Sequence, residues 1–446
     1  MKIGFIAMSG VRAHNPELTK LGLTLPGFIE RNKTIASLSS LGLLTLAGMT
    51  PDHFGASYVD VPDVDALSEL PGEFDVVAIS SFTAQIKEAY ALADRYRAAG
   101  TKVVLGGLHV NALPQEASQH ADSVVLGEGE IAWSRVLTDL EQGGLAPVYD
   151  ARGESFDLRD APMPRFELLD VDRYNRLTVQ TQRGCPFSCE FCAASIRISP
   201  TYKVKPVEKV MAEVRRIKQI WTKPFIEFAD DNTFVNKKHS KMLMRALAKE
   251  SVRWFTETDI SVAEDHELLS LMCDSGCAQV LIGLESASLI GLDGLEQKTN
   301  WKAKQWDHYF EAIRRIQDHG ITVNGCFILG LDGTGPDSFD AVWDFVRTSG
   351  LYEVQVTVQT AFPGTPLYER LRREGRMLRE GAWELCTLFD VNFRPTHMSV
   401  TELESGLRNL VGRLYSDEFT RERRWNFHRR WRELRRQPTT TRSQAL

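Results

Sequence analysis

The stretch Arg183-Gly184-Cys185-Pro186-Phe187-Ser188-Cys189-Glu190-Phe191-Cys192 contains three of the seven cysteines of this 446-residue chain. Iron–sulfur clusters are normally held by four cysteine thiolates, so three thiolates at CxxxCxxC spacing can bind three irons of a [4Fe-4S] cluster and leave the fourth iron open. An open iron can bind and reduce another molecule. The alternatives are a structural zinc site, which requires four ligands that this loop lacks, and buried free thiols, which the close spacing disfavours.

The composition predicts a globular chain with two folded domains and an appendage, because 43% of its residues are hydrophobic and 25% are charged. A net charge of -6 gives no overall attraction to nucleic acid, which is therefore not expected as a partner. The apolar run 36–49 is interrupted by serines and is too short to cross a bilayer, so no transmembrane segment is expected. Seven cysteines with three clustered favour reduced thiols, as in a cytoplasmic protein.

Residues 1–150 alternate short apolar strands with helical patterns, which predicts an α/β domain with a doubly wound, Rossmann-like parallel sheet. Ligands of such sheets bind at the carboxyl ends of the strands. Glycines there let a bulky ligand approach the backbone, although a glycine after a strand often only permits a tight turn. The expected strands are Lys2–Met8, Ala56–Val61, Asp75–Ser80, Lys102–Gly106 and Ser123–Gly127, and the polar or glycine residues at their ends include Ser80, Gly106, Gly107, Gly127 and Glu128.

Residues 151–175 have no clear period and are expected to form a linker between two domains. Strand and helix patterns then alternate about six times over residues 176–390, which predicts a partial (β/α)6 barrel of the TIM type. The cysteine loop follows the first strand, where the chemistry of such barrels resides. The expected strands are Leu177–Gln182, Pro224–Ala229, Arg253–Thr258, Gln279–Leu284, Thr322–Gly330 and Tyr352–Ala361.

Residues 391–446 are predicted to be a helical extension and a tail, with the tail disordered after residue 437. The segment 421–436 contains eight arginines together with Trp425, Phe427 and Trp431. It could contact an anionic partner or a membrane surface, or its aromatic side chains could dock on the barrel. The remaining cysteines are expected to pack in the core rather than bind a second cluster, and they are Cys273, Cys277, Cys326 and Cys386.

These motifs together resemble the radical S-adenosylmethionine (SAM) enzymes that carry an N-terminal cobalamin-binding-type domain. The resemblance rests on the CxxxCxxC loop and, in the first domain, on Ser37-Leu38-Ser39-Ser40-Leu41-Gly42-Leu43-Leu44, on the Gly-Gly-x-His of residues 106–109 and on Gly127-Glu128-Gly129-Glu130. It implies a [4Fe-4S] cluster on Cys185, Cys189 and Cys192, SAM on the open iron, and cobalamin at the strand ends of the first domain, including Ser80, Gly106, Gly107, Gly127 and Glu128.

One departure concerns the lower face of cobalamin. The family motif DxHxxG, which places a histidine below cobalt, is absent, and Asp52-His53-Phe54-Gly55 does not reproduce its spacing. A histidine ligand is therefore not expected. The alternative is a domain that has kept the fold and lost the cofactor.

The resemblance also implies SAM contacts at later strand ends of the barrel. Asp230 and Asp231 occupy the place of the family's glycine-glycine-glutamate motif, which binds the SAM ammonium group. Glu285 and Ser286 resemble the ribose and carboxylate motif, and Gly330 and Pro363 lie in segments similar to those that flank adenine. Each has a structural alternative, because an acidic pair can cap a helix and Pro363-Gly364 can simply turn the chain.

The resemblance implies that a reduced cluster cleaves SAM to give a 5′-deoxyadenosyl radical, which abstracts hydrogen from a substrate. Electrons would come from a donor such as flavodoxin or ferredoxin. With cobalamin present, the leading hypothesis is a cobalamin-dependent C-methyltransferase that acts on a small biosynthetic precursor. Alternatives are transfer of the 3-amino-3-carboxypropyl group to a soft acceptor such as trivalent arsenic, radical cyclisation or rearrangement, and a noncatalytic redox-sensing or binding module.

Overall fold

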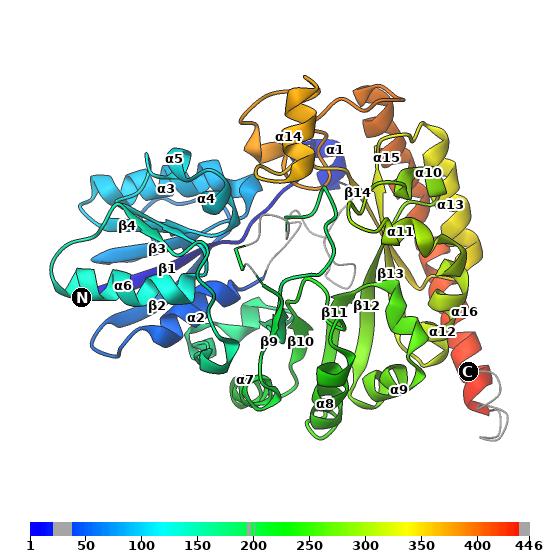
Figure 1. Cartoon of the computed structure of the whole chain (residues 1–446), viewed down its shortest axis with the longest axis horizontal. Helices are drawn as coiled ribbons and strands as arrows, with labels where there is room; N and C mark the ends of the chain where they lie inside the picture. Colours follow the sequence, from blue (N-terminus) through cyan, green and yellow to red (C-terminus); the bar gives the residue numbers. More distant parts are fainter. Residues whose placement is uncertain (21–37, 194–197, 200, 437–446) are drawn as a thin grey trace.

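Two parallel six-stranded sheets dominate the structure, a computed structural model that describes residues 1–20, 38–193, 198–199 and 201–436. The first sheet and its helices form one side of the molecule, and the second sheet with its helices forms the other (Figure 1). The predicted doubly wound sheet and partial barrel are both confirmed. Ser37 and the tail from residue 437 lie outside the described residues.

The first sheet has the strand order β2-β1-β3-β4-β5-β6, with every neighbouring pair parallel. Its strands are almost continuously apolar because helices cover both faces. The helix α3 (Ile86–Ala98) packs on one face, and α2 (Leu41–Met49) and α6 (Gly129–Glu141) pack on the other. The strands are β1 (Lys2–Met8), β2 (Gly55–Val61), β3 (Val76–Ser80), β4 (Lys102–Gly106), β5 (Ser123–Leu126) and β6 (Val148–Asp150), the last not anticipated from the sequence.

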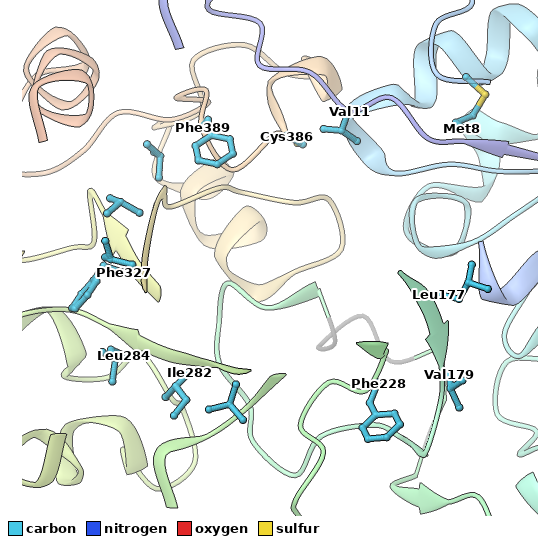
Figure 2. Close-up of a cluster of buried hydrophobic side chains, with 14 of the residues drawn as sticks. Met8, Val11, Leu177, Val179, Phe228, Ile282, Leu284, Phe327, Cys386 and Phe389 are labelled. Atoms are coloured by element: carbon cyan, nitrogen blue, oxygen red, sulfur yellow. The ribbon is translucent and has the colours of Figure 1, made fainter. Parts of the chain in front are cut away.

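The second sheet has the order β14-β13-β12-β11-β10-β7, again with parallel neighbours. Alternate strand residues join one buried core, and Figure 2 labels some of them: Leu177, Val179, Phe228, Ile282, Leu284 and Phe327. The strands are β7 (Leu177–Val179), β10 (Phe225–Phe228), β11 (Arg253–Thr258), β12 (Cys277–Glu285), β13 (Thr322–Leu329) and β14 (Glu353–Val358), and the connecting helices include α7 (Val207–Ile220), α8 (Lys237–Leu247), α9 (His266–Asp274), α12 (Tyr309–Asp318) and α13 (Asp337–Ser349).

The first expected barrel strand is shorter than predicted. Strand β7 ends at Val179, and the next residues form β8 (Gln182–Arg183), which pairs antiparallel with β9 (Lys203–Val204). This small hairpin closes the base of the cysteine loop. Short helices complete the described chain: α1 (Pro16–Lys20), α4 (Leu108–Ala112), α5 (Pro114–Ala117), α10 (Leu289–Leu292), α11 (Trp301–Lys304) and 3-10 turns at Thr83–Gln85, Leu158–Asp160, Phe166–Leu168, Val171–Arg173, Ile260–Glu264, Trp306–His308 and Trp383–Leu385.

The C-terminal segment adds α14 (Pro366–Arg373), α15 (Val400–Leu414) and the arginine-rich α16 (Asp417–Arg436). Helix α16 lies along the barrel, because the buried Arg423 pairs with Glu353 at 3.2 Å and Phe427 packs edge-on against Tyr352. Trp425 remains exposed. Arg424 and Arg430 also pair with barrel carboxylates, Glu353 at 2.9 Å and Asp318 at 2.5 Å, so one face of α16 docks on the barrel.

The two sheets are joined by a segment that follows the barrel. The backbone N–H groups of His14 and Asn15 donate to the carboxylate of Asp390 at 2.7 and 2.9 Å. Trp383 donates its indole N–H to Glu116 at 3.1 Å. The apolar core also continues across the junction (Figure 2), where Met8 and Val11 belong to the same cluster as Cys386 and Phe389. No helix in the described chain is long and apolar enough to cross a membrane.

Candidate functional site

A cavity of about 570 Å³ lies at the carboxyl ends of the first sheet, facing the cysteine loop. All five residues predicted for cobalamin line it, namely Ser80, Gly106, Gly107, Gly127 and Glu128. The opposite wall includes Arg183, Gly184, Cys192 and Asp231 from the barrel domain, and Leu158 and Pro162 from the expected linker. The structure thus brings the predicted cobalamin region and part of the predicted cluster region to one cavity.

Two glycines line this cavity, and the lack of a side chain has a different consequence at each position. Gly127 has a φ of +83°, and a Cβ there would lie 2.6 Å from the backbone of Ala151, so the fold itself requires glycine. Gly106 is outside the left-handed region, and the nearest atom to its Cβ position is Val125 Cβ at 3.8 Å. The missing side chain at Gly106 therefore leaves open space in the cavity. Together with apolar walls from Val104 and Leu46, this broad surface fits one face of a corrin ring.

Histidine does not line the described wall of this cavity. His53 is exposed near the amino end of β2 and lies 2.8 Å from Glu141. His109 is buried, and its Nε2 lies 3.2 Å from Glu116 on the side of the domain that contacts Trp383. Neither histidine lines the described wall of the cavity, and the absence of a histidine ligand below cobalt stays a prediction.

Glu128 is the centre of an ion network between the domains, rather than a free carboxylate in the cavity. Arg183 donates to it at 2.6 Å and Lys203 at 2.7 Å, and the Phe156 N–H donates at 2.8 Å. Arg183 also binds Glu130 at 2.6 Å. Burial alone would raise the pKa of Glu128, but these donors hold it below its usual range. These contacts hold Arg183, at the start of the cysteine loop, against the first domain. The position of Glu128 in the sequence did not indicate this role.

The three cysteines of the loop are free thiols of intermediate exposure. Burial raises the pKa of Cys185, and raises that of Cys189 to about 12, so these two thiols are protonated in an unliganded loop. Among the described residues, no three Cys, His, Asp or Glu side chains are already drawn together in metal-binding geometry. The donor set nevertheless suits iron–sulfur chemistry, because three thiols share one loop and Cys192 lines the cavity.

Glu296 anchors this loop and was not predicted from the sequence. Its carboxylate accepts from the Ser188 N–H at 3.2 Å and from the N–H and hydroxyl of Thr299, both at 2.8 Å. Burial opposes its charge, yet these bonds lower the pKa of Glu296 to about 2. The Glu190 N–H also donates to the Leu295 carbonyl at 3.1 Å. Fixed charge and backbone pairing thus hold the loop from the barrel side.

The two aspartates after β10 have different surroundings. Asp230 is buried and accepts from the N–H groups of Thr181 and Gln182 at 2.8 and 3.0 Å, which ends β7 and directs the chain into the cysteine loop. Asp231 is exposed and lines the cavity, and its negative charge helps to raise the pKa of Cys185. Asp231 is therefore better placed than Asp230 to bind a ligand ammonium group.

Glu285 has a left-handed backbone, with a φ of +65°, at a break in the register of β12 with β13. Non-glycine residues adopt this conformation at a cost, and such strain is concentrated at functional sites. Lys302 holds the carboxylate at 2.9 Å and also donates to the Gly283 carbonyl at 2.6 Å. Lys302 was not predicted, because only the fold brings it to Glu285.

The other predicted SAM residues lie near barrel ends, but the contacts they make in the structure are within the protein. The Ser286 hydroxyl accepts from the Ser288 N–H at 3.1 Å. Gly330 has a φ of +80°, and a Cβ there would lie 2.8 Å from Leu403. Pro363 is buried in the turn that precedes α14. Their contacts with SAM remain predictions.

Comparison with known proteins identifies both the first domain and the barrel domain. The family model of the radical SAM superfamily matches residues 179–346, and that of the B12-binding domain matches residues 36–137. The chain is a radical SAM enzyme with an N-terminal B12-binding domain. Residues 365–446 match a domain of unknown function, DUF4070.

Relatives that match most of the chain include proteins named as methyltransferases. The chain is 27% identical over 381 residues to bacteriochlorophyllide d C-12(1)-methyltransferase of Chlorobaculum tepidum, covering 84% of this chain and 82% of that one. It is 26% identical to hopanoid C-2 methylase of Rhodopseudomonas palustris, covering 76% and 65%. The solved structure of the radical SAM methyltransferase TsrM from Kitasatospora setae, with tryptophan and a SAM analogue bound, has a TM-score of 0.64 at 15% identity, covering 85% and 77%. The last comparison supports the fold.

Proposed function

We propose that this radical SAM enzyme is a cobalamin-dependent C-methyltransferase that acts on a small biosynthetic precursor. The observation that carries the proposal is the shared cavity, whose walls include Gly106 of the first sheet and Cys192 of the cysteine loop. A methyl carrier on the first sheet and a radical source on the loop would then face the same space. The methyltransferase relatives support the same reaction class.

When bound, the cluster and SAM would supply one-electron chemistry, and cobalamin would supply a transferable methyl group. The chain's own residues hold and orient these groups. Cys185, Cys189 and Cys192 would ligate the cluster, with Asp231 on the SAM ammonium group and Glu285 on its ribose. The ion pair of Arg183 with Glu128 keeps the two halves of the cavity in a fixed relation, which a reaction between three bound molecules requires.

We also propose the setting in which this activity operates. Protonated thiols at Cys185 and Cys189 and an oxygen-sensitive cluster suit a reducing cytoplasm. Electrons would come from a small donor such as flavodoxin or ferredoxin, because the cleavage of SAM requires a strong reductant.

Product analysis tests the proposal. The protein is purified without oxygen, its cluster is rebuilt, and SAM and reductant are added with and without cobalamin. Formation of 5′-deoxyadenosine with cobalamin-dependent S-adenosylhomocysteine is expected, whereas methylthioadenosine would indicate aminocarboxypropyl transfer instead. Cys273→Ala is the matched control, because this exposed cysteine lies on α9 away from the loop and should leave the products unchanged. A protein that cleaves no SAM would contradict the proposal.

A further inference from the structure

The inner face of the barrel sheet carries buried polar atoms that no other side chain or backbone group satisfies. Side chains alternate along each strand, and the outward set, such as Val280 and Ile282, packs in the core beneath the helices. The intervening residues therefore face the barrel interior. Within the described part of the chain, side-chain oxygens of this inner set lack a hydrogen-bond partner at Thr178, Gln279, Asn324, Gln355 and Gln359.

Asn324 is the most enclosed member of this set. Its exposed fraction is 0%, and neither the nitrogen nor the oxygen of its amide has a partner among the described residues. Buried side-chain amides in native proteins are almost always bonded. Gln279 donates its Nε2 to Thr322 at 3.2 Å, so its oxygen is the atom left over. Four orphaned amide oxygens stand against one orphaned amide nitrogen, that of Asn324, so this set of amides favours a ligand that brings hydrogen-bond donors.

The same surface has a carboxylate beside open space. Strand register places Glu257 opposite Leu281, and Leu281 opposite Asn324. Glu257 keeps a large exposed fraction although surrounding protein desolvates it, and this burial, with repulsion from Glu227, raises its pKa to about 7. Glu257 therefore borders a solvent-reachable space inside the barrel.

Cations beside this surface are already bound to other carboxylates. Arg176 pairs with Glu227, and Lys302 pairs with Glu285 at 2.9 Å. Glu257 has no ion-pair partner within the described chain. The surface is therefore rich in acceptors and, above the pKa of Glu257, carries an unpaired negative charge, which favours N–H and O–H donors and opposes carboxylates and phosphates.

We propose that the inner barrel face around Glu257 and Asn324 binds the donor-bearing end of the methyl-accepting substrate, an amine or a hydroxyl group. This inference rests on the proposed methyltransferase function and deepens it by naming the substrate class. Leu281 and Ile328 are partly exposed on the same face and provide apolar contact for the carbon skeleton. The substrate is thus an amphipathic amine or alcohol, in preference to a carboxylic acid or phosphate ester.

Binding of three matched probes tests the inference without turnover. The full chain is prepared with its cluster, hydroxocobalamin and SAM, but without reductant, and benzylamine, benzyl alcohol and benzoate are titrated by ligand-observed NMR. The three share one ring and differ in charge and donor count. Benzylamine should bind at least tenfold more tightly than benzoate, with benzyl alcohol between them. Equal binding of benzoate, or no binding by any probe, would overturn the proposal.

Two variants connect the binding to these residues. Glu257→Gln should reduce the preference for benzylamine over benzoate at least fivefold, and Asn324→Leu should weaken both benzylamine and benzyl alcohol. The matched control is Glu267→Gln, an exposed glutamate of α9 that should leave all three affinities unchanged. An unaltered probe preference in Glu257→Gln would refute the assignment.

Asn324→Leu also separates a ligand-binding role from a structural one. Because no group among the described residues satisfies this amide, the leucine variant should melt at the same temperature as the parent or higher. A lower melting temperature would show that Asn324 supports the fold and would remove it from the site. Failure of the methyltransferase proposal is read separately, from the nucleoside products of the reduced enzyme.

Discussion

The two parallel sheets of this chain differ in what covers their faces. Helices pack on both faces of the first sheet, so a ligand can reach only the ends of its strands. The barrel sheet has an apolar outer face beneath helices and a polar inner face with unsatisfied amides. The difference indicates a division of labour: the first sheet can present a bound group at its edge, whereas the barrel can also contact a ligand along the strands.

The cysteine loop lies between the two regions, and its loss should have the largest effect. Cys185→Ala, Cys189→Ala or Cys192→Ala should each abolish the visible absorbance of the rebuilt cluster, because three ligands leave none to spare. SAM cleavage should fall below detection in all three. A full cluster in any one variant would break the assignment, while Cys326→Ala, on the inner face of β13, should keep the cluster.

A substitution at Gly106 tests whether cobalamin binds at the carboxyl ends of the strands of the first sheet. Gly106→Phe should place a ring in the cavity and reduce retained cobalamin at least about tenfold, measured by visible absorption after gel filtration. Gly106→Ala is the control, because its Cβ would meet Val125 only at 3.8 Å and should be tolerated. Normal cobalamin retention by the phenylalanine variant would show that the corrin binds elsewhere.

The link between the regions is the ion network of Arg183. Arg183→Ala leaves the fully buried side chain of Glu128 with Lys203 as its remaining cation, and should lower the free energy of unfolding by about 3 kcal/mol. Urea unfolding measures this change. Arg135→Ala removes an exposed pair with Glu154 and should cost less than about 1 kcal/mol. Similar losses in both variants would mean that the network does not couple the domains.

Most of the architecture and one part of the site could be predicted from the sequence. Continuous apolar runs identify the first sheet, and cysteine spacing identifies the cluster loop. Glu296 and Lys302 were missed because their partners, Ser188 and Glu285, are distant in sequence. Glu128 was read as a ligand contact because its position at a strand end does not reveal that Arg183 binds it.

The inner amides did have a sequence signal. In Glu353-Val354-Gln355-Val356-Thr357-Val358 the apolar residues alternate with polar ones, which indicates a strand with one packed face and one polar face. The sequence does not show that the polar face of this strand points into the barrel, because this depends on how the barrel sheet closes.

Acid unfolding tests how firmly the barrel holds the cysteine loop. The folded pKa of Glu296 is about 2, against 4.5 for the unfolded group, so its contribution is complete above pH 4.5 and is lost as the pH falls toward 2. This shift corresponds to about 3 kcal/mol. Glu296→Gln should lower stability at neutral pH by about 2 kcal/mol and flatten the acid dependence over that window. Glu141→Gln, at an exposed pair, should leave the dependence intact.

The smallest change in stability is expected at Gln359. It is compared with the change at Gln85, so that one buried glutamine from each region is tested. Gln85, beside the first sheet, accepts from the Gly10 N–H at 2.9 Å, whereas the Gln359 oxygen at the end of β14 has no partner among the described residues. Both are 2% exposed. Gln85→Met should lower the urea midpoint, with a loss of about 1–3 kcal/mol, because it leaves a buried backbone group unpaired.

Gln359→Met removes an amide oxygen that no described residue bonds, so stability should stay constant or rise by up to about 1 kcal/mol. Opposite signs in the two variants would establish that the polar groups of the first region support its fold, while those of the barrel interior are kept at the expense of stability. Polar residues that are kept although they lower stability are expected to bind a ligand. Equal losses would instead mean that Gln359 is bonded within the protein, and the contrast between the two sheets would disappear.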